Sequence, residues 1–131
     1  MFDTRSASSA ALAYLGDAVI EVLVRERLVN EGYTSSKSLN AHALSFVRAS
    51  AQAKAMARIL PSLSEEESAV FHRGRNIGHT GTPKNATVGE YRAATGMEAL
   101  FGYLHMTGQK ERIVALFELA YPKEQKDEDQ I

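Results

Sequence analysis

Two acidic residues lie inside apolar runs of this sequence. Asp17 is within Ala-Ala-Leu-Ala-Tyr-Leu-Gly-Asp-Ala-Val-Ile (residues 10–20), and Glu98 is within Gly-Met-Glu-Ala-Leu-Phe-Gly-Tyr-Leu (residues 96–104). These surroundings predict two buried carboxyl groups, each of which must be neutralised, hydrogen-bonded or bound to a cation, because an unpartnered buried charge is costly. Carboxylate oxygens in a chain without cysteine favour Mg²⁺ or Mn²⁺ over zinc. A pair of structural carboxylates held by hydrogen-bond donors is the alternative.

A second candidate region is the run from His72 to Lys84, which contains no acidic residue. It carries Arg73, Arg75 and Lys84 together with two histidines. Such a run is either a phosphate-contacting segment or a solvated basic loop. The histidines of the chain lack the spacing of a zinc site on a helix, so we do not expect them to bind metal.

Helical periodicity and capping signals predict the elements that position these residues. Strand-like alternation is not sustained anywhere, so the predicted fold class is all-α. The expected helices are one from Ser9 to Asn30 followed by Gly32; a stretch opened by Ser35, Ser36 or Ser38 that runs to Leu60 and can break near Ser45; one capped by Ser64 and Glu67 that reaches about Asn76; one capped by Thr87 and Glu90 that ends at Gly108; and a last one ending at Pro122.

Length and charge indicate one domain with a charged tail. The chain has 131 residues, so we expect a domain over 1–122 and a flexible tail over 123–131. The 15 basic and 16 acidic residues include Lys126 and four acids beyond residue 123, so the remainder holds 14 basic and 12 acidic residues, a net charge of +2. The absence of cysteine excludes disulfides and thiolate chemistry. Without a signal peptide or a membrane-spanning run, we expect a cytoplasmic protein that does not enter a membrane.

Four motifs in this order resemble Mini-ribonuclease III. They are Leu-Ala-Tyr-Leu-Gly-Asp-Ala-Val (12–19), Arg-Gly-Arg-Asn (73–76), Thr-Pro-Lys-Asn (82–85) and Glu-Ala-Leu-Phe-Gly-Tyr-Leu (98–104). The resemblance extends from about Ser8 to Tyr121. It implies an all-helical ribonuclease III-like catalytic domain without a double-stranded-RNA-binding domain. It also implies a twofold homodimer that cleaves double-stranded RNA, notably the stem flanking precursor 23S ribosomal RNA in bacteria.

The resemblance places Asp17 on the invariant aspartate of the family and Glu98 on its final metal-binding glutamate. Longer ribonuclease III enzymes carry two further acids, at positions that are Ala13 and Thr95 here. This departure is typical of the Mini class and leaves fewer protein ligands for each ion. Either more waters complete the coordination, or one metal site is weak and fills only when RNA is bound.

The implied activity is metal-dependent hydrolysis of a phosphodiester, with Asp17 and Glu98 as catalytic Mg²⁺ ligands. Mn²⁺ is a substitute. The resemblance implies 5′-phosphate and 3′-hydroxyl ends and one site in each subunit. A ribosomal protein that presents the substrate is a further candidate partner.

The same motifs suggest which residues contact RNA. Because the major groove of A-form RNA is too narrow to read, contacts must reach phosphates and 2′-hydroxyls. The candidates are Arg73, Arg75, Asn76, Thr82, Lys84 and Asn85, and the loop from Thr80 to Lys84 is either a flap over the duplex or an ordinary linker.

Four residues are candidates for supporting the metal ligands. Glu21 lies one helical turn after Asp17 and either faces the same cleft or pairs with Arg25. Tyr14 is a candidate, as is Tyr91, although a helical tyrosine more often belongs to the core. Thr95 lies one turn before Glu98.

Two other functions fit parts of the sequence. A helical nucleotide pyrophosphohydrolase needs repeated Glu-x-x-Glu or Glu-x-x-Asp pairs, whereas Glu65, Glu66 and Glu67 are better explained as a helix start. A noncatalytic double-stranded-RNA-binding ribosome-assembly factor is the other alternative, but it has no reason to retain both Asp17 and Glu98. The first helix and the Glu98 helix are more apolar than one small domain requires, which predicts a dimer.

Overall fold

The computed structural model describes residues 2–3, 6–77 and 85–123, and the elements it contains are all helical. The prediction of an all-α fold is therefore confirmed. No helix in this part of the chain is long and apolar enough to cross a membrane. The elements are α1 (Ser9–Asn30), α2 (Ser36–Val47), α3 (Ala49–Ile59), the short 3₁₀ helix η1 (Leu60–Ser62), α4 (Glu65–Arg75), α5 (Val88–Met106) and α6 (Lys110–Ala120).

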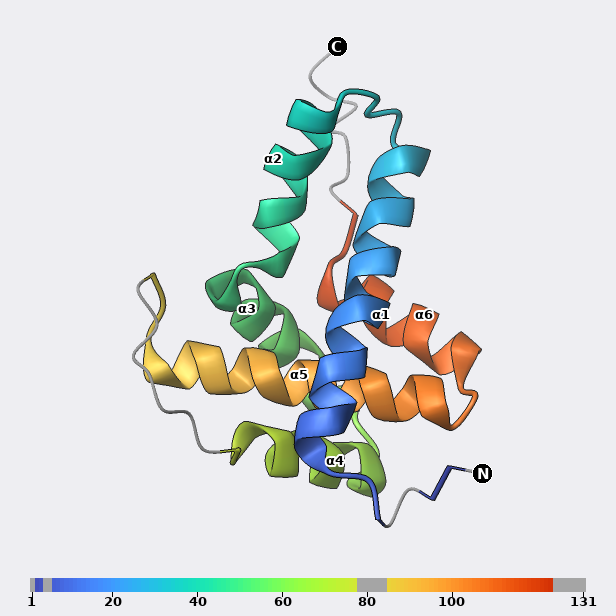
Figure 1. The fold of residues 1–131 in the computed structure, drawn as a ribbon, viewed down its shortest axis with the longest axis vertical. Coiled ribbons are helices and arrows are strands. Elements are labelled where there is room, and N and C mark those ends of the chain that lie inside the picture. The colour runs from blue at the N-terminus through green and yellow to red at the C-terminus, as the bar shows by residue number, and fades with distance from the viewer. Residues whose placement is uncertain (1, 4–5, 78–84, 124–131) are drawn as a thin grey trace.

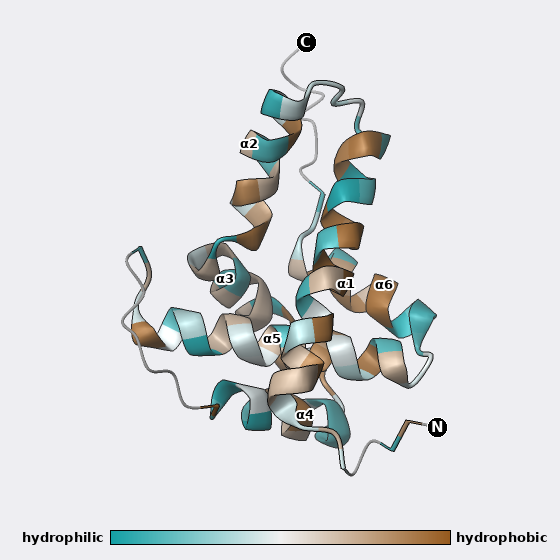
Figure 2. Cartoon of the chain, in the orientation of Figure 1, coloured by the Kyte–Doolittle hydropathy of each residue, from teal (hydrophilic) through white to brown (hydrophobic). Residues whose placement is uncertain are grey.

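Helix α5 is the centre of the fold. Its side chains at Met97, Leu100, Phe101 and Leu104 are completely buried, and α1, α3, α4 and α6 all pack against it. Figure 1 shows α1 crossing α5 at a steep angle, with α4 on one side of α5 and α3 on the other. Apolar residues recur along the full length of α1 in Figure 2.

Two glycines allow α1 and α5 to touch through their backbones. A Cβ atom added to Gly16 would lie 1.6 Å from the backbone oxygen of Glu98, and one added to Gly102 would lie 2.0 Å from the backbone oxygen of Leu12. No other residue fits at either position without moving a helix. The crossing therefore places Asp17, the neighbour of Gly16, beside Glu98.

Most helix boundaries follow the predicted signals. Ser64 with Glu67 and Thr87 with Glu90 form complete capping boxes. Gly32 has a φ of +94° directly after the end of α1, where a left-handed backbone favours glycine.

The predicted break in the second helical stretch occurs three residues later than expected, at Arg48. This residue has an extended backbone, with φ of −61° and ψ of 145°, between α2 and α3. Ser45 remains within α2, and its hydroxyl donates a hydrogen bond to the carbonyl oxygen of His42 at 2.7 Å. The turn at Arg48 lets α3 bury Gln52, Ala55, Met56 and Ile59, whereas α2 buries no residue.

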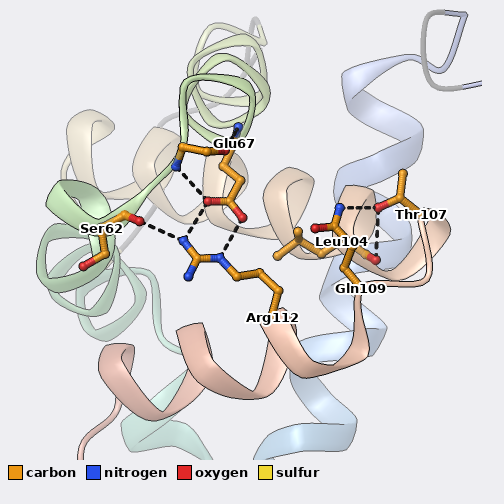
Figure 3. Close-up of polar contacts among 7 residues, drawn as sticks. Ser62, Glu67, Leu104, Thr107, Gln109 and Arg112 are labelled. Atoms are coloured by element: carbon orange, nitrogen blue, oxygen red, sulfur yellow. Dashed lines mark hydrogen bonds and ion pairs between the residues drawn. The ribbon is translucent and has the colours of Figure 1, made fainter.

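An ion pair ties the start of α4 to α6 (Figure 3). The Arg112 guanidinium donates from Nε to Glu67 Oε2 and from Nη2 to Glu67 Oε1, both at 2.8 Å, and from Nη2 to the carbonyl oxygen of Ser62 at 2.7 Å. Glu67 also accepts from the backbone N–H of Ser64 at 2.8 Å. These bonds hold the pKa of Glu67 below its ordinary value of 4.5.

We expect Glu67→Gln to destabilise the protein by about 2 kcal/mol at neutral pH, because the Arg112 charge loses its partner while glutamine can still cap the helix. The lowered pKa means that the unfolded chain binds the proton more tightly, so this difference is complete above pH 4.5 and disappears as the pH falls through the folded-state pKa. Urea denaturation over a pH series measures it. The exposed Glu65→Gln is the control, and an equal loss in both variants would contradict a role for the ion pair.

Candidate active site

Asp17 and Glu98 meet where α1 crosses α5. Burial, the negative charge of Asp17 and a hydrogen bond with the Asp17 side chain together raise the pKa of Glu98 to about 8. Glu98 therefore holds its proton at neutral pH. The tertiary structure brings together two residues that are 81 positions apart in the sequence.

The expectation that both carboxyl groups are buried is wrong for Asp17. Its side chain is exposed and that of Glu98 is half-buried. The apolar residues around Asp17 misled the prediction because several of them are themselves exposed, with Tyr14 at 85 % and Val22 at 54 %. Asp17 lies at the edge of the helix interface, where solvent and a substrate can reach it.

The carboxyl groups of Asp17 and Glu98 would give a bound cation hard oxygen ligands, and the nearby side chains add few others. Among the described residues, no group of three or more histidine, cysteine, aspartate or glutamate side chains could hold a metal. Ala13 is buried, and the Thr95 hydroxyl donates to the carbonyl oxygen of Tyr91 at 3.0 Å. Mg²⁺ commonly binds through one or two carboxylates and retains waters or substrate phosphates, so this donor set fits it. A cation would also offset the burial and the Asp17 charge that raise the pKa of Glu98.

The candidate supporting residues lie at different depths. The Glu21–Arg25 pair predicted from the spacing is present, with Arg25 Nε 3.7 Å from Glu21 Oε2. That Glu21 oxygen is buried and accepts no hydrogen bond from any described residue. Tyr14 does not belong to the core, and Tyr91 is 39 % exposed.

The end of α4 is held beside the turn of α5 that precedes Glu98. A Cβ on Gly74 would lie 2.6 Å from the Ala99 side chain, and one on Gly96 would lie 2.7 Å from the Phe71 ring. This packing fixes the last turn of α4, which carries an exposed Arg73 and a half-buried Arg75 and ends at an exposed Asn76.

Arginines in the last turn of a helix can donate to its free carbonyl groups, and Arg73 and Arg75 are placed for this at the end of α4. Neither guanidinium donates a hydrogen bond to another residue in the described part of the chain. Asn85 is exposed just before the cap of α5. Thr82 and Lys84, with the rest of the loop from Thr80, lie outside the described residues, as does the tail from Glu124.

No role for Gly16 and Gly102 was predicted from the sequence. A signal for them was available, because glycine inside a helix costs ~1 kcal/mol relative to alanine and its presence there indicates a close backbone approach. Both glycines interrupt apolar helical runs beside the two acids.

Comparison with known proteins identifies the fold. The ribonuclease III domain family matches residues 10–109. The Mini-ribonuclease 3 of Symbiobacterium thermophilum is 49% identical over 109 residues, which cover 83% of this chain and 84% of that protein. The chain belongs to the Mini-ribonuclease 3 group of the ribonuclease III family. The Mini-ribonuclease 3 of Enterococcus faecalis is 45% identical over 118 residues, covering 88% of this chain and 89% of that protein.

A solved structure agrees with this Mini-ribonuclease 3 assignment. A crystal structure of a protein from Fusobacterium nucleatum superimposes with a TM-score of 0.85 at 30% identity and covers 94% of this chain and 100% of its own. The family resemblance predicted from four motifs is thus confirmed. Membership makes the protein an endoribonuclease for double-stranded RNA, in a family that is generally dependent on divalent metals and typically dimeric.

The raised pKa of Glu98 makes a prediction for the metal-free protein. The folded state holds the Glu98 proton more tightly than the unfolded chain, so stability falls as the pH rises from 4.5 to about 8. We expect Glu98→Gln to be more stable than the unmutated protein by ~2 kcal/mol at the upper end of this range, after allowance for solvent screening.

Denaturant titrations in the presence of a chelator measure this gain at several pH values. The gain should vanish below pH 4.5, where Glu98 is protonated in both states. Glu26→Gln, an exposed acid on α1, is the control. A Glu98→Gln variant no more stable than the unmutated protein would show that burial and Asp17 do not raise the pKa of Glu98.

Proposed function

We propose that this endoribonuclease cleaves the double-stranded stem flanking precursor 23S ribosomal RNA, using Mg²⁺ held by Asp17 and Glu98. Mn²⁺ substitutes for Mg²⁺, and the products carry 5′-phosphate and 3′-hydroxyl ends. The observation that carries the proposal is the contact of the two carboxyl groups at the α1–α5 crossing, in a family of ribonucleases.

The two ligands have different environments, which suits different tasks. Glu98 is half-buried on the central helix, so it anchors the ion to the most rigid part of the fold. Asp17 is exposed and faces the space that an RNA phosphate must enter. When bound, Mg²⁺ lowers the pKa of a coordinated water and polarises a phosphoryl oxygen. The protein supplies position, and Tyr14, Glu21 and Thr95 lie within one helical turn of a ligand to support it.

RNA is held by its backbone in this proposal. Arg73 and Arg75 present planar donors that suit phosphate oxygens, and the Asn76 amide suits a 2′-hydroxyl. Thr82 and Lys84, outside the described residues, and the exposed Asn85 extend the same surface. Because α4 packs on α5 through Phe71 and Gly74, this surface keeps a constant position relative to Glu98.

A second subunit completes the assembly. An open apolar cavity of about 390 Å³ lies between α1 and α6, lined by Leu15, Ala18, Val19, Val22, Leu23, Ile113 and Val114, with His105 and Lys110 also on its wall. Tyr14, Val22 and Val29 add an exposed apolar stripe on α1. An apolar face of this kind favours a twofold contact with another copy, which brings two sites to one duplex for staggered cuts.

The proposed substrate also suggests where in the cell the protein acts and which further partner it has. Precursor ribosomal RNA is made in the bacterial cytoplasm, so we place the protein there. Each chain has a formal net charge of −1, and a ribosomal protein bound to the precursor would help to present the stem.

We expect Mg²⁺-dependent cutting of a long RNA duplex, no cutting of either single strand, and at least a 100-fold slower rate in Asp17→Asn and Glu98→Gln, because each variant removes a ligand of the ion. Glu21→Gln, the matched change one turn away, should slow the reaction less than about tenfold. End-labelled products assayed with a phosphatase and a kinase report the 5′ end. Binding of duplex without cutting by the unmutated protein would favour the noncatalytic assembly factor.

The dimer has a separate test. Val22→Glu places a charge in the cavity wall and should weaken self-association at least 100-fold, as measured by analytical ultracentrifugation. Val88→Glu is a matched control, because Val88 is 50 % exposed at the start of α5 and does not line the cavity. A Val22→Glu protein that remains as dimeric as the control would contradict this interface.

A further inference from the structure

The segment from Gly32 to Ser64 contains no acidic residue, although the chain has 16 aspartates and glutamates among its 131 residues. It forms α2, α3 and η1. Its basic residues are Lys37, Arg48, Lys54 and Arg58. A surface of one sign in a chain with a formal net charge of −1 indicates an anionic partner.

One of these cations has a structural role and two others are available. Arg58 donates from Nη1 to the carbonyl oxygen of Ala120 at 2.7 Å, which ties α3 to α6. Arg48 and Lys54 are exposed. Ion pairs between described residues involve Arg25, Arg27 and Arg112, so neither Arg48 nor Lys54 has an acidic partner in that part of the chain.

The helix that carries Lys54 and begins directly after Arg48, α3, lies on the other side of α5 from α4. Helix α3 packs on α5 through its buried face of Gln52, Ala55, Met56 and Ile59. Helix α4 packs on α5 as well, and Figure 1 shows α3 and α4 on opposite sides of the N-terminal half of α5. The half of α5 that leads to Glu98 is therefore bordered by two basic elements.

We propose that Arg48 and Lys54 bind backbone phosphates of the RNA duplex and form a second basic wall opposite Arg73 and Arg75. The inference rests on the proposed function and adds two positioning residues to it. A duplex presents two phosphate backbones, so a single wall leaves it free to rotate about its axis, whereas two walls set the strand that faces Asp17 and Glu98. Arginine and lysine on the same wall favour phosphate over base edges, so the contact is independent of sequence.

The double variant Arg48→Gln/Lys54→Gln tests this proposal. In an Asp17→Asn background, which binds RNA without cutting it, we expect about tenfold weaker binding of a long duplex at moderate salt. The slope of log K against log salt should fall by about two, because each of the two cations neutralises one phosphate. In the active protein, KM should rise about tenfold while kcat changes little, because the ligands of the ion are intact.

Lys37→Gln is the matched control. Lys37 belongs to the same acid-free segment and is exposed, but it lies in the first turn of α2, about 16 Å along the helix from Arg48. The affinity and salt slope of this variant should equal those of the unmutated protein. An equal effect of Lys37→Gln, or equal competition by poly-glutamate, would replace the proposal with a diffuse anion attraction.

The outcomes separate this inference from the proposed function. If the unmutated protein cuts duplex RNA and the double variant keeps its full salt slope and KM, the second wall is wrong and the nuclease assignment stands. If the unmutated protein neither binds nor cuts duplex RNA, both the proposed function and the second basic wall are wrong. Unchanged circular dichroism and melting temperature in the double variant confirm that a loss of binding is not a loss of fold.

Discussion

The close crossing of α1 and α5 is the constraint on which the site depends. Gly16 and Gly102 remove the side chains that would otherwise separate the two backbones, and the helices approach until a Cβ has no space. Asp17 lies against Glu98 as a result, because it directly follows Gly16 in α1. The raised pKa of Glu98 is the electrostatic consequence of that steric arrangement. The proximity of the two carboxyl groups is thus a consequence of how closely the two helices pack.

A half-buried carboxyl group beside another acid costs stability once it ionises, and contacts elsewhere hold the helices together. Arg27 is buried between the rings of Phe46 and Phe117, donates to Glu118 at 3.0 Å and also donates to the carbonyl oxygen of Tyr121. Arg112 holds α4 to α6 in the same way. Both ties join elements that are distant in sequence and lie away from the α1–α5 crossing. These ion pairs tie the helices together away from the exposed Asp17.

Local chemistry made the helices predictable. Ser64 with Glu67, and Thr87 with Glu90, satisfy free N–H groups within one turn, so a sequence pattern is enough to locate both helix starts. The break between α2 and α3 is at Arg48 and not at the expected Ser45, because the packing of α3 on α5 sets its position and no local signal does. Burial was predicted least well. Asp17 and Tyr14 lie in apolar runs that face outward, and a hydropathy pattern does not distinguish a core from a surface that binds another subunit.

The sequence by itself predicted the all-helical class, the family and the choice of Asp17 and Glu98 as candidate site residues. Helix caps, glycine positions and the order of motifs carry this information, because they are properties of residues that are close together in the sequence. The tertiary structure alone decided that burial and the neighbouring Asp17 raise the pKa of Glu98, that Asp17 is exposed and Glu98 half-buried, and that α3 and α4 lie on opposite sides of α5. Those facts depend on the angle and depth at which helices cross. Side-chain volumes summed over the whole core set these quantities, and no short segment encodes them.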